Sequence, residues 1–209
     1  MTEQPIANNL MRYGDRAFLI ELDSAANVLA VRQQLLAAQH PAISAVVPAA
    51  RTVLVEADAR LTEADLRQLL SQPPPPKEPT TSEAKTVELA VTYDGPDLAA
   101  VARLIGESER DVIHRHTQAE YTVQFCGFSA GFSYLIGGDP ALSIPRLDRP
   151  RTHVPAGSVA IASEYTGIYP RSSPGGWRIL GHTDAVLFDL EREPPALLTP
   201  GTQVRLRAR

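Results

Sequence analysis

The sequence predicts an α+β protein in two parts: a small α+β domain at residues 1–71 and a β-rich domain at residues 86–209. Three observations lead to this prediction. A proline-rich segment interrupts the chain, helical spacing alternates with short strands before it, and short strands separated by Gly and Pro dominate after it. Short strands punctuated in this way are typical of a barrel or closed sheet.

The predicted boundary is the segment 72–85, which reads QPPPPKEPTTSEAK. Four consecutive prolines favour an extended, polyproline-like path, and the polar residues around them cannot build a core. We therefore expect a linker between the two domains.

The first part opens with two apolar runs in residues 11–22, on either side of the turn residues Gly14 and Asp15. Ser24 is placed to cap a helix that we expect to reach about Gln39, since its apolar residues recur at helical spacing.

Residues 43–47 and 52–56 then read as strands. Thr62 and Asp65 have the spacing of a capping box, which predicts the start of a second helix. The whole order fits a small split β-α-β sandwich with an additional hairpin.

The second part begins with a strand expected at residues 86–93, a turn at residues 94–97 and an apolar-faced helix. Ser108 and Asp111 predict another capped helix that ends near His116. Further strands are expected at residues 121–125, 158–162, 167–169, 177–180, 186–190 and 203–207. In the last one Arg205 and Arg207 alternate with apolar residues, which favours a solvated outer face over an anion-binding row.

Composition excludes several classes. The net charge of -4 argues against a general nucleic-acid binder, because neutralising phosphates requires a basic surface. The first residues resemble no secretory signal, and no apolar run reaches the roughly 20 residues of a membrane span. A single cysteine, Cys126, excludes an internal disulfide and is expected to be a buried thiol. We expect a cytoplasmic protein.

Residues 127–131 spell G-x-S-x-G, the pattern of a nucleophile elbow around Ser129. An elbow needs a helix after the serine, and the following residues include Gly137, Gly138 and Pro140, so we expect a tight loop instead.

The same loop carries Phe128 and Phe132, each preceded by glycine, with Tyr134 just beyond. Aromatic rings beside permissive backbone suit a ligand pocket or an interface with another protein, while core packing is the alternative.

His114 and His116 lie two positions apart, so a helix would not turn both toward one metal ion. With no other ligand pattern, we expect no metal site in this chain. His116 is the candidate general base, although geometry decides that role.

The segment 172–177 is rich in glycine but lacks the lysine of a phosphate-binding loop, so the chain carries no nucleotide motif. Its Gly175 and Gly176 fit a hairpin turn with positive φ, and Trp177 is expected in the core. Four arginines nearby suggest recognition of an anionic group, with solvation of each as the alternative: Arg146, Arg149, Arg151 and Arg171.

Together these motifs resemble the family of the 5-oxoprolinase B-type subunit, also called allophanate hydrolase subunit 1, which includes a Kip-type inhibitor of a sporulation histidine kinase. The resemblance is dense from Tyr93 to Gly201. Its markers are Tyr93–Leu98, His116-Thr117, Tyr121–Val123, Gly127–Leu135, Pro145-Arg146, Pro150-Arg151, Val154–Ala162, Ile168–Pro170, Ser173–Trp177, Leu187–Asp189 and Pro195–Gly201.

The resemblance implies a cyclophilin-like β-barrel for the second domain. It also implies two partners, which are a C-type subunit, separate or fused, and a lactam-hydrolase A-type subunit. In such a complex ATP cleavage drives the opening of 5-oxoproline to glutamate. ATP would be used by the complex, and the isolated chain would be inactive.

The sequence departs from the family pattern at several positions. Ala130 replaces a frequent proline, Ser129 a frequent alanine, and Tyr165 a frequent polar residue. His182-Thr183 stands where Arg-Thr is common. The substrate could therefore differ from 5-oxoproline.

The leading hypothesis is the B-type subunit of an ATP-dependent amide hydrolase, sharing a site with the C-type subunit. One alternative is an inhibitor of a sensor histidine kinase, and another is a carboxyltransferase or allophanate-hydrolase-type subunit of urea metabolism. The expected substrate or partner surface comprises Phe128, Phe132, Tyr134, Arg146, Arg151, Pro155, Gly157, Ser158, Tyr169, Ser173, Gly175 and Gly176.

Overall fold

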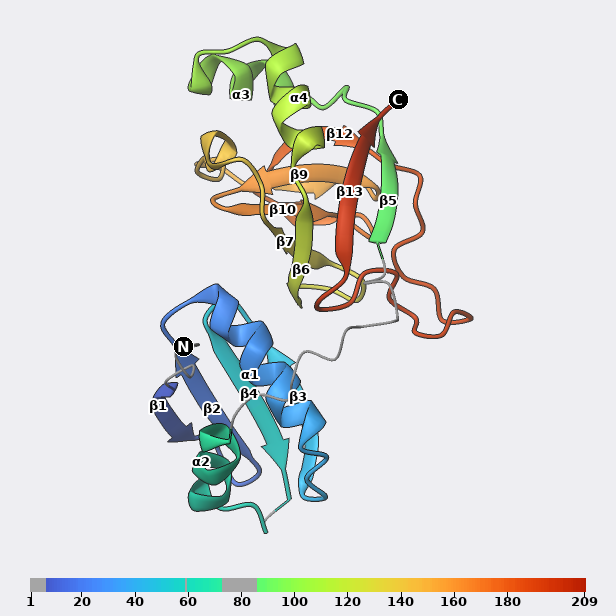
Figure 1. The fold of residues 1–209 in the computed structure, drawn as a ribbon. Coiled ribbons are helices and arrows are strands. Elements are labelled where there is room, and N and C mark those ends of the chain that lie inside the picture. Colours follow the sequence, from blue (N-terminus) through green and yellow to red (C-terminus); the bar gives the residue numbers. More distant parts are fainter. Residues whose placement is uncertain (1–6, 59, 73–85) are drawn as a thin grey trace. The chain divides into compact units, whose positions relative to one another are not determined.

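The computed structural model describes residues 7–58, 60–72 and 86–209 (Figure 1). The chain divides into two compact units, Met1–Ser82 and Glu83–Arg209. Of the expected linker at residues 72–85, only Gln72 lies within the described residues.

The first unit contains a four-stranded antiparallel sheet and two helices. The sheet has the order β1-β2-β4-β3, so β2 and β3 are both antiparallel to β4, which lies between them. Helix α1 connects β2 to β3, and this is the split β-α-β arrangement that the sequence predicts. The elements are β1 Ala7–Arg12, β2 Ala17–Leu22, α1 Ala25–Ala37, β3 Ile43–Pro48, β4 Thr52–Ala57 and α2 Glu63–Ser71.

Alternating burial in β2 and β4 builds the core of this unit. Ile20 and Leu22 of β2 and Val53 and Val55 of β4 are fully buried on one face, where α1 packs. The side-chain amide of Gln34 in α1 donates to the carbonyl oxygens at the end of α2, those of Leu69 and Gln72, at 2.8 Å each. The two helices are thereby joined by polar as well as apolar contacts.

The predicted helix starts are confirmed. The Ser24 hydroxyl accepts a hydrogen bond from the backbone N–H of Asn27 at 3.4 Å, and α1 begins at Ala25, directly after Ser24. Both capping boxes form reciprocally, at Thr62 with Asp65 and at Ser108 with Asp111. Local side-chain chemistry therefore fixes these boundaries.

The second unit is built on a seven-stranded sheet of order β12-β9-β10-β7-β6-β13-β5, in which only the β13–β5 pair is parallel. The two edges meet because Thr92, just after β5, and His182, at the end of β12, exchange two backbone hydrogen bonds of 2.9 Å. The sheet is thus a nearly closed, barrel-like structure.

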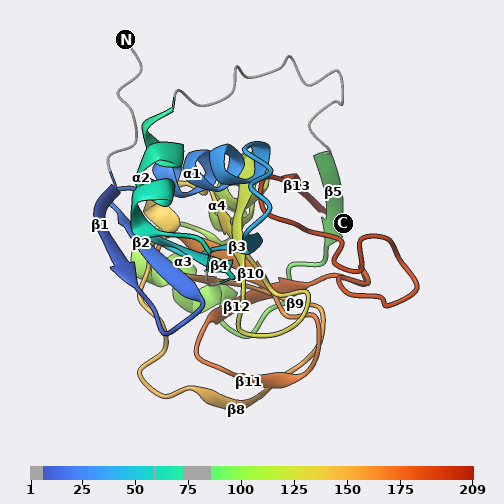
Figure 2. The ribbon, with the colours of Figure 1, turned by 90° about the horizontal axis from the view of Figure 1, so that it is seen from below.

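Its elements are β5 Thr86–Val91, α3 Leu98–Ile105, α4 Glu109–Gln118, β6 Tyr121–Cys126, β7 Ser133–Ile136, the 3-10 turn Pro140–Leu142, β8 Arg151–Val154, β9 Ser158–Ala162, β10 Tyr165–Ile168, β11 Ser173–Gly175, β12 Arg178–His182 and β13 Gln203–Ala208. Figure 2 shows β8 and β11 side by side, as a two-stranded ribbon separate from the larger sheet. Helices α3 and α4 pack on each other and share a core with Ile161 and Leu180.

The strand predictions are right in most places and wrong in a few. Residues 186–190 form no strand; Phe188 makes an isolated bridge to Ala196, while Val186 and Leu190 are exposed. Their apolar alternation mimics a strand but has no partner strand to pair with. The sequence does not predict strands β7, β8 and β11, since the glycines and prolines next to them resemble a continuous loop.

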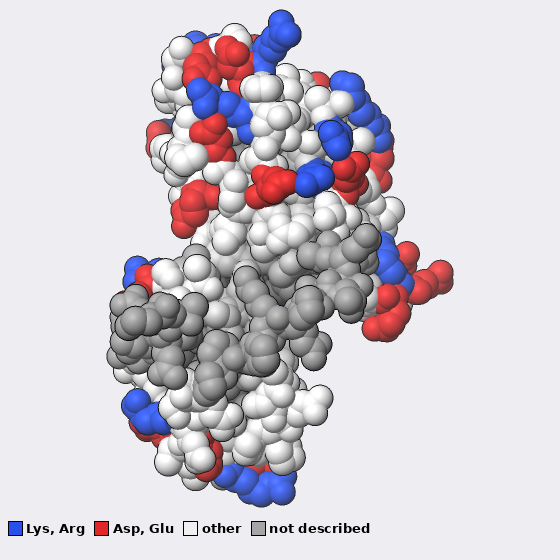
Figure 3. All heavy atoms as spheres, viewed as in Figure 1, with Lys and Arg blue, Asp and Glu red and all other residues white. Residues whose placement is uncertain are grey.

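The arginines of β13 lie on the outside, as expected. Arg205 pairs with Glu120 at 2.5 Å and Arg207 with Glu88 at 2.9 Å, and all four side chains are well exposed. Figure 3 shows arginine and acidic side chains interspersed over this face. Within the described parts of the chain, no helix has the length and apolarity that a bilayer crossing requires.

Candidate functional site

A cavity of about 480 Å³ lies beside the point where the barrel closes. The turn before α3, strand β8, the turn after it and strand β12 all contribute to its wall. The lining residues are Asp94, Gly95, Pro96, Arg151, His153, Pro155, Ala156, Ser158, Ile179, Gly181 and His182. Three of the predicted surface residues meet here: Arg151, Pro155 and Ser158.

An acid–imidazole pair lies in the wall of this cavity. The Asp94 carboxylate Oδ1 is 2.9 Å from Nδ1 of His182, and both side chains are exposed. The two residues are 88 positions apart in the sequence, so no motif spacing announces them. Sequence reasoning missed the pair, because only the closure of the barrel brings it together.

Arg151 is held in place by a buried partner. Its Nη2 donates to Asp97 Oδ1 at 2.7 Å, and the other oxygen of Asp97 accepts from the backbone N–H of Ile179 at 2.7 Å. Asp97 begins α3 but makes no side-chain cap, since both oxygens serve these contacts. Arg151 also donates to the Trp177 carbonyl at 3.4 Å. A guanidinium has five N–H groups, so donors remain for a bound carboxylate or phosphate.

The turn that carries Pro155 and Ser158 depends on a close backbone approach. Gly157 has φ of 79°, and a Cβ there would lie 2.4 Å from the carbonyl oxygen of Thr183. Its backbone bonds to Thr183 and Tyr169 at 2.9 and 2.7 Å fix the turn that presents Pro155 and Ser158. Gly157 therefore shapes the site without offering a functional group.

The predicted aromatic residues form a second cluster, most of it core. Phe132 is 1% exposed, and its ring packs edge-on against Tyr134, Tyr169 and Trp177 at 5.1, 5.2 and 5.5 Å. Phe128 differs, since the residue is 62% exposed and its backbone has φ of 66°. Among these residues, Phe128 is the one available to a partner.

The glycine-rich segment has a structural explanation. Ser173 and Gly175 belong to β11, and a Cβ at Gly175 would lie 2.3 Å from the Tyr169 hydroxyl oxygen. Neither Gly175 nor Gly176 has a positive φ, so the predicted hairpin turn is wrong. Glycine at position 175 is required by the approach of Tyr169 instead. Trp177 is buried, as predicted.

The four arginines of the sequence prediction differ in their surroundings. Arg146, Arg149 and Arg171 are exposed, and only Arg151 of the four lines the cavity. Burial raises the pKa of Tyr134, and the charge of Arg146 opposes that rise. Arg146 therefore lies close enough to act on the edge of the aromatic cluster.

His116 is not the general base that the sequence suggested. It is fully buried; its Nδ1 is 2.8 Å from the Tyr93 hydroxyl and its Nε2 is 3.0 Å from the Thr166 hydroxyl. Burial lowers its pKa to about 3, so it is a neutral core histidine at physiological pH. Both ring nitrogens are occupied and neither faces solvent.

The G-x-S-x-G loop is not a nucleophile elbow either. It joins β6 to β7, so a strand follows where an elbow needs a helix. Ser129 lies in that turn. Cys126 just before it is half-buried, less enclosed than expected, and its thiol donates to the carbonyl of Leu198 at 3.4 Å. In the described part of the chain, no group of three or more His, Cys, Asp and Glu side chains is placed to hold a metal ion.

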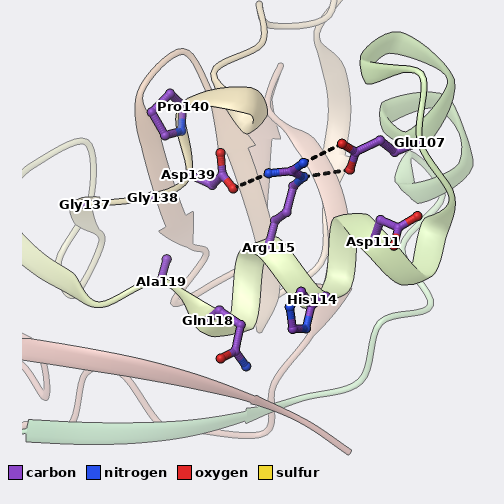
Figure 4. A pocket seen from close by; sticks show the side chains of 10 residues that line it. All are labelled: Glu107, Asp111, His114, Arg115, Gln118, Ala119, Gly137, Gly138, Asp139 and Pro140. Atoms are coloured by element: carbon purple, nitrogen blue, oxygen red, sulfur yellow. Dashed lines mark hydrogen bonds and ion pairs between the residues drawn. The ribbon is translucent and has the colours of Figure 1, made fainter.

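A second cavity, of about 700 Å³, surrounds Arg115 on α4 (Figure 4). Arg115 points between two carboxylates, donating to both oxygens of Glu107 at 2.5 and 2.7 Å and to Asp139 at 2.7 Å. The hydrogen bonds from Arg115 lower the pKa of Glu107. The pKa of Asp139 is also lowered, first by the backbone N–H of Ala141 and then by Arg115. The cavity is larger, but its central charges are already paired, and its lining contains none of the residues of the predicted substrate or partner surface.

Comparison with known proteins gives the family context. Residues 9–198 match the model described as carboxyltransferase domain, subdomain C and D. The chain is 48% identical over 126 residues to the 5-oxoprolinase B subunit of Escherichia coli O157:H7, which is 59% of this chain and 58% of that protein. For the 5-oxoprolinase B subunit of Bacillus subtilis strain 168, identity is 44% over 124 residues, 58% of this chain and 52% of that protein. The matches thus span little more than half the length of these relatives.

Solved structures extend the comparison. The structure of TTHA0988 has a TM-score of 0.79 at 37% identity over 93% of this chain, but this is only 40% of that chain. PH0987 of Pyrococcus horikoshii has a TM-score of 0.59 at 33% identity, with 96% and 97% of the two chains covered. Urea carboxylase of Kluyveromyces lactis, at 21% identity over 96% of this chain and 21% of that chain, shares the fold with a TM-score of 0.67.

Proposed function

The chain belongs to the carboxyltransferase domain family, subdomains C and D, and we propose that it acts as the B-type subunit of an ATP-dependent 5-oxoprolinase. In this role it contributes one wall of a site that it shares with a homologue of the C-type subunit. Its second unit is proposed to be a cyclophilin-like barrel, with domains at 1–71 and 86–209 and a linker between them.

The observation that carries the proposal is the cavity beside Arg151. Its volume of about 480 Å³ suits a small polar molecule. A cyclic amide with a carboxylate presents two groups that this wall can recognise. The remaining N–H donors of Arg151 match the carboxylate, and the Asp94–His182 pair matches the amide.

Support for a partner comes from the relatives and from the surface. The same module makes up 40% of the TTHA0988 chain and 21% of the urea carboxylase chain, so it occurs alongside further domains. Phe128 and Leu190 expose 62% and 82% of their surface, which suits an interface with another protein. We assign ATP to the partners, since the glycine-rich segment 172–177 lacks the lysine of a phosphate-binding loop.

The test is reconstitution. The chain is purified together with homologues of the C-type and lactam-hydrolase A-type subunits, and glutamate release from 5-oxoproline is followed with and without ATP. We expect ATP-dependent release from the complete set and none from the chain alone. A stable complex that releases no glutamate would overturn the substrate assignment.

A matched pair of variants distinguishes a specific loss of substrate binding in the cavity from a general loss of structure. Arg151→Lys keeps the charge but loses the planar fork, so we expect a higher KM for 5-oxoproline, by about tenfold or more. Arg149→Lys changes an exposed arginine outside the cavity and should leave KM unaltered. Equal behaviour of the two variants would contradict a role for Arg151 in substrate binding.

A further inference from the structure

We propose that two adjacent loops of the second unit form a preformed docking surface, and that the C-type subunit homologue meets it with an apolar socket rimmed by arginine or lysine. The surface, called here the two-loop patch, comprises Phe128 of the β6–β7 loop and Val186, Phe188 and Leu190 after β12. The inference rests on the proposed function, because it identifies where on this chain, and through which chemistry, the partner binds.

The two-loop patch collects exposed apolar side chains on one unit. Phe128 and Val186 are each 62% exposed, Leu190 is 82% exposed and Phe188 is 36% exposed. Among the described residues of the second unit, Leu104 on α3 is the one other large apolar residue that is exposed. Single exposed apolar residues are common on soluble proteins, but several that share one region are typical of an interaction site.

The two loops that carry the patch lie against each other. Gly131 of the β6–β7 loop has φ of 81°, and a Cβ there would lie 2.7 Å from Cβ of Phe188 and 3.3 Å from the carbonyl oxygen of Leu187. The Phe128 ring packs edge-on against that of Phe132 at 5.4 Å, which ties its loop to the aromatic core. The exposed parts of Phe128 and Phe188 therefore lie on neighbouring segments of the same surface.

The loop that carries Leu190 is held in its shape by its own hydrogen bonds. The backbone N–H groups of Asp189 and Leu197 donate across the loop, at 3.0 and 2.9 Å, to carbonyl oxygens of the opposite arm. The Arg192 guanidinium also reaches back to donate to the Val186 carbonyl at 2.9 Å. A loop that is already ordered loses little conformational entropy on binding, so Leu190 is presented ready for a partner.

The rim of the patch is acidic. Residues 186–197 contain three carboxylates, Asp189, Glu191 and Glu193, and a single arginine, Arg192. Arg192 is engaged within the loop, by a carbonyl oxygen and by Asp189 at 3.9 Å, whereas Glu191 and Glu193 are exposed. Figure 3 shows acidic side chains gathered where this loop projects, at the right of the view. An apolar centre with an acidic rim is complementary to an apolar socket with a basic rim.

The charge of the rim also decides which occupant fits. A second copy of this chain would bring one acidic rim against another, and like charges that face each other oppose association. A phospholipid or nucleic-acid surface is disfavoured for the same reason, because its phosphates are anionic. The partner of the proposed function, the C-type subunit homologue, is the occupant to which we assign the socket.

The first test removes an apolar contact. Leu190→Ser withdraws the most exposed side chain of the patch, so we expect the Kd for the C-type subunit homologue, measured by titration calorimetry, to rise about tenfold. Leu104→Ser changes another exposed leucine of the same unit and should leave Kd unaltered. Both positions are exposed, so the fold should be retained, which circular dichroism checks. A Leu190→Ser chain that binds as tightly as the wild type would overturn the proposal.

The second test reverses the charge of the rim. Glu191→Lys combined with Glu193→Lys should slow association about tenfold at low salt, and the difference should shrink as salt is raised. Glu21→Lys with Glu56→Lys makes the same change in charge at exposed positions of the first unit, and should leave the rate unaltered. Faster association of the loop variant, or an equal effect of the two double variants, would contradict a basic rim on the partner.

These outcomes are separable from those of the proposed function. A complex that forms through the patch yet releases no glutamate would leave the docking surface in place and overturn the substrate assignment. An active complex whose affinity is the same in Leu190→Ser as in the wild type would do the reverse. A concentration-dependent dimer of the chain alone, lost in Leu190→Ser, would show that the patch binds a second copy, and would also overturn the proposal.

Discussion

His116 and His182 carry the same imidazole in opposite surroundings. His116 hydrogen-bonds to Tyr93 and Thr166 inside the barrel, whereas His182 faces a cavity with one carboxylate beside it. A burial this complete lowers the pKa of His116 to about 3, because a charged ring would lose its hydration. Position in the fold therefore decides whether an imidazole is enclosed in the core or open to the cavity.

The buried histidine makes folding stability depend on pH. Below its ordinary pKa of 6.5 the unfolded chain protonates His116, and the folded chain does not until pH falls to about 3. The unfolded state binds more protons in this window, so stability is lost as pH falls, by up to about 1.4 kcal/mol per unit. Chemical denaturation at a series of pH values should show this slope.

His116→Gln is the control for that measurement. It removes the titrating group, so its free energy of unfolding should fall less steeply between pH 6.5 and 4. Carboxylates whose pKa is lowered in the fold, such as Asp139, contribute equally to both proteins and cancel. Parallel slopes in the two proteins would contradict a neutral buried His116.

Phe128 and Phe132 should respond very differently to substitution. Phe128→Asn relieves a positive φ that costs about 1–2 kcal/mol and removes an exposed ring, so stability should change by less than about 1 kcal/mol. Phe132→Ala opens a cavity in the core and should cost about 3–5 kcal/mol. Urea denaturation measures both effects.

The Phe128 variant also tests the proposed interface with the partner subunit. Phe128→Asn should weaken binding to the C-type subunit homologue while leaving the chain folded, as measured by titration calorimetry. Unchanged affinity would remove Phe128 from the proposed interface. Strain retained at an exposed aromatic residue is the reason to expect a loss of binding.

At the scale of elements, the sequence predicts a boundary correctly where the contacts that form it are local. The capping boxes at Thr62 and Ser108 could be read directly, because each depends on contacts three residues apart. Strands β8 and β11 could not be predicted in this way, because they pair with each other outside the main sheet and show little alternation of apolar and polar residues. The Asp94–His182 pair was hidden for the same reason, as it depends on a bridge between distant strands.

The backbone bridge between Thr92 and His182, which closes the barrel, leads to a separate prediction. Gly181→Ala would place a methyl group 2.1 Å from the Thr92 carbonyl oxygen, so the two edges must separate. We expect a loss of about 4 kcal/mol or more in the free energy of unfolding, and faster amide exchange at Thr92 and His182.

Gly106→Ala provides the comparison. Gly106 ends α3 with φ of 74° and has nothing within 4 Å of its Cβ position, so backbone strain of about 1 kcal/mol is the expected cost. Similar losses in the two variants would mean that close approach at the bridge is unimportant.

At the scale of the whole molecule, the two units have separate cores. One apolar cluster draws on Met1–Ser82 alone, while three others belong to Glu83–Arg209. The sequence predicts a boundary at the proline-rich segment 72–85, because prolines and polar residues cannot form a core. The cavity was visible only in part, because Arg151, Pro155 and Ser158 follow one another but their acid–imidazole neighbours do not.

Because the two units have separate cores, we expect the second unit to fold on its own. A fragment covering residues 83–209 should unfold cooperatively and keep the backbone amide NMR signals that the second unit shows in the full chain. Its Asp94 and barrel closure are internal to the fragment, so the site should survive. Shifted amide signals of the residues that line the cavity, in a folded fragment, would show that the first unit supports the site.

The parallel pairing of β5 and β13 has a mechanical consequence. Residues 86–91 lie beside residues 203–208 in register, and the chain enters the unit at the start of β5 and leaves it at the end of β13. A force that pulls these two ends apart drags the strands past each other along their length. All the hydrogen bonds of the pair then bear the load together instead of opening one at a time, so the barrel should resist stretching far better than a hairpin pulled from adjacent ends.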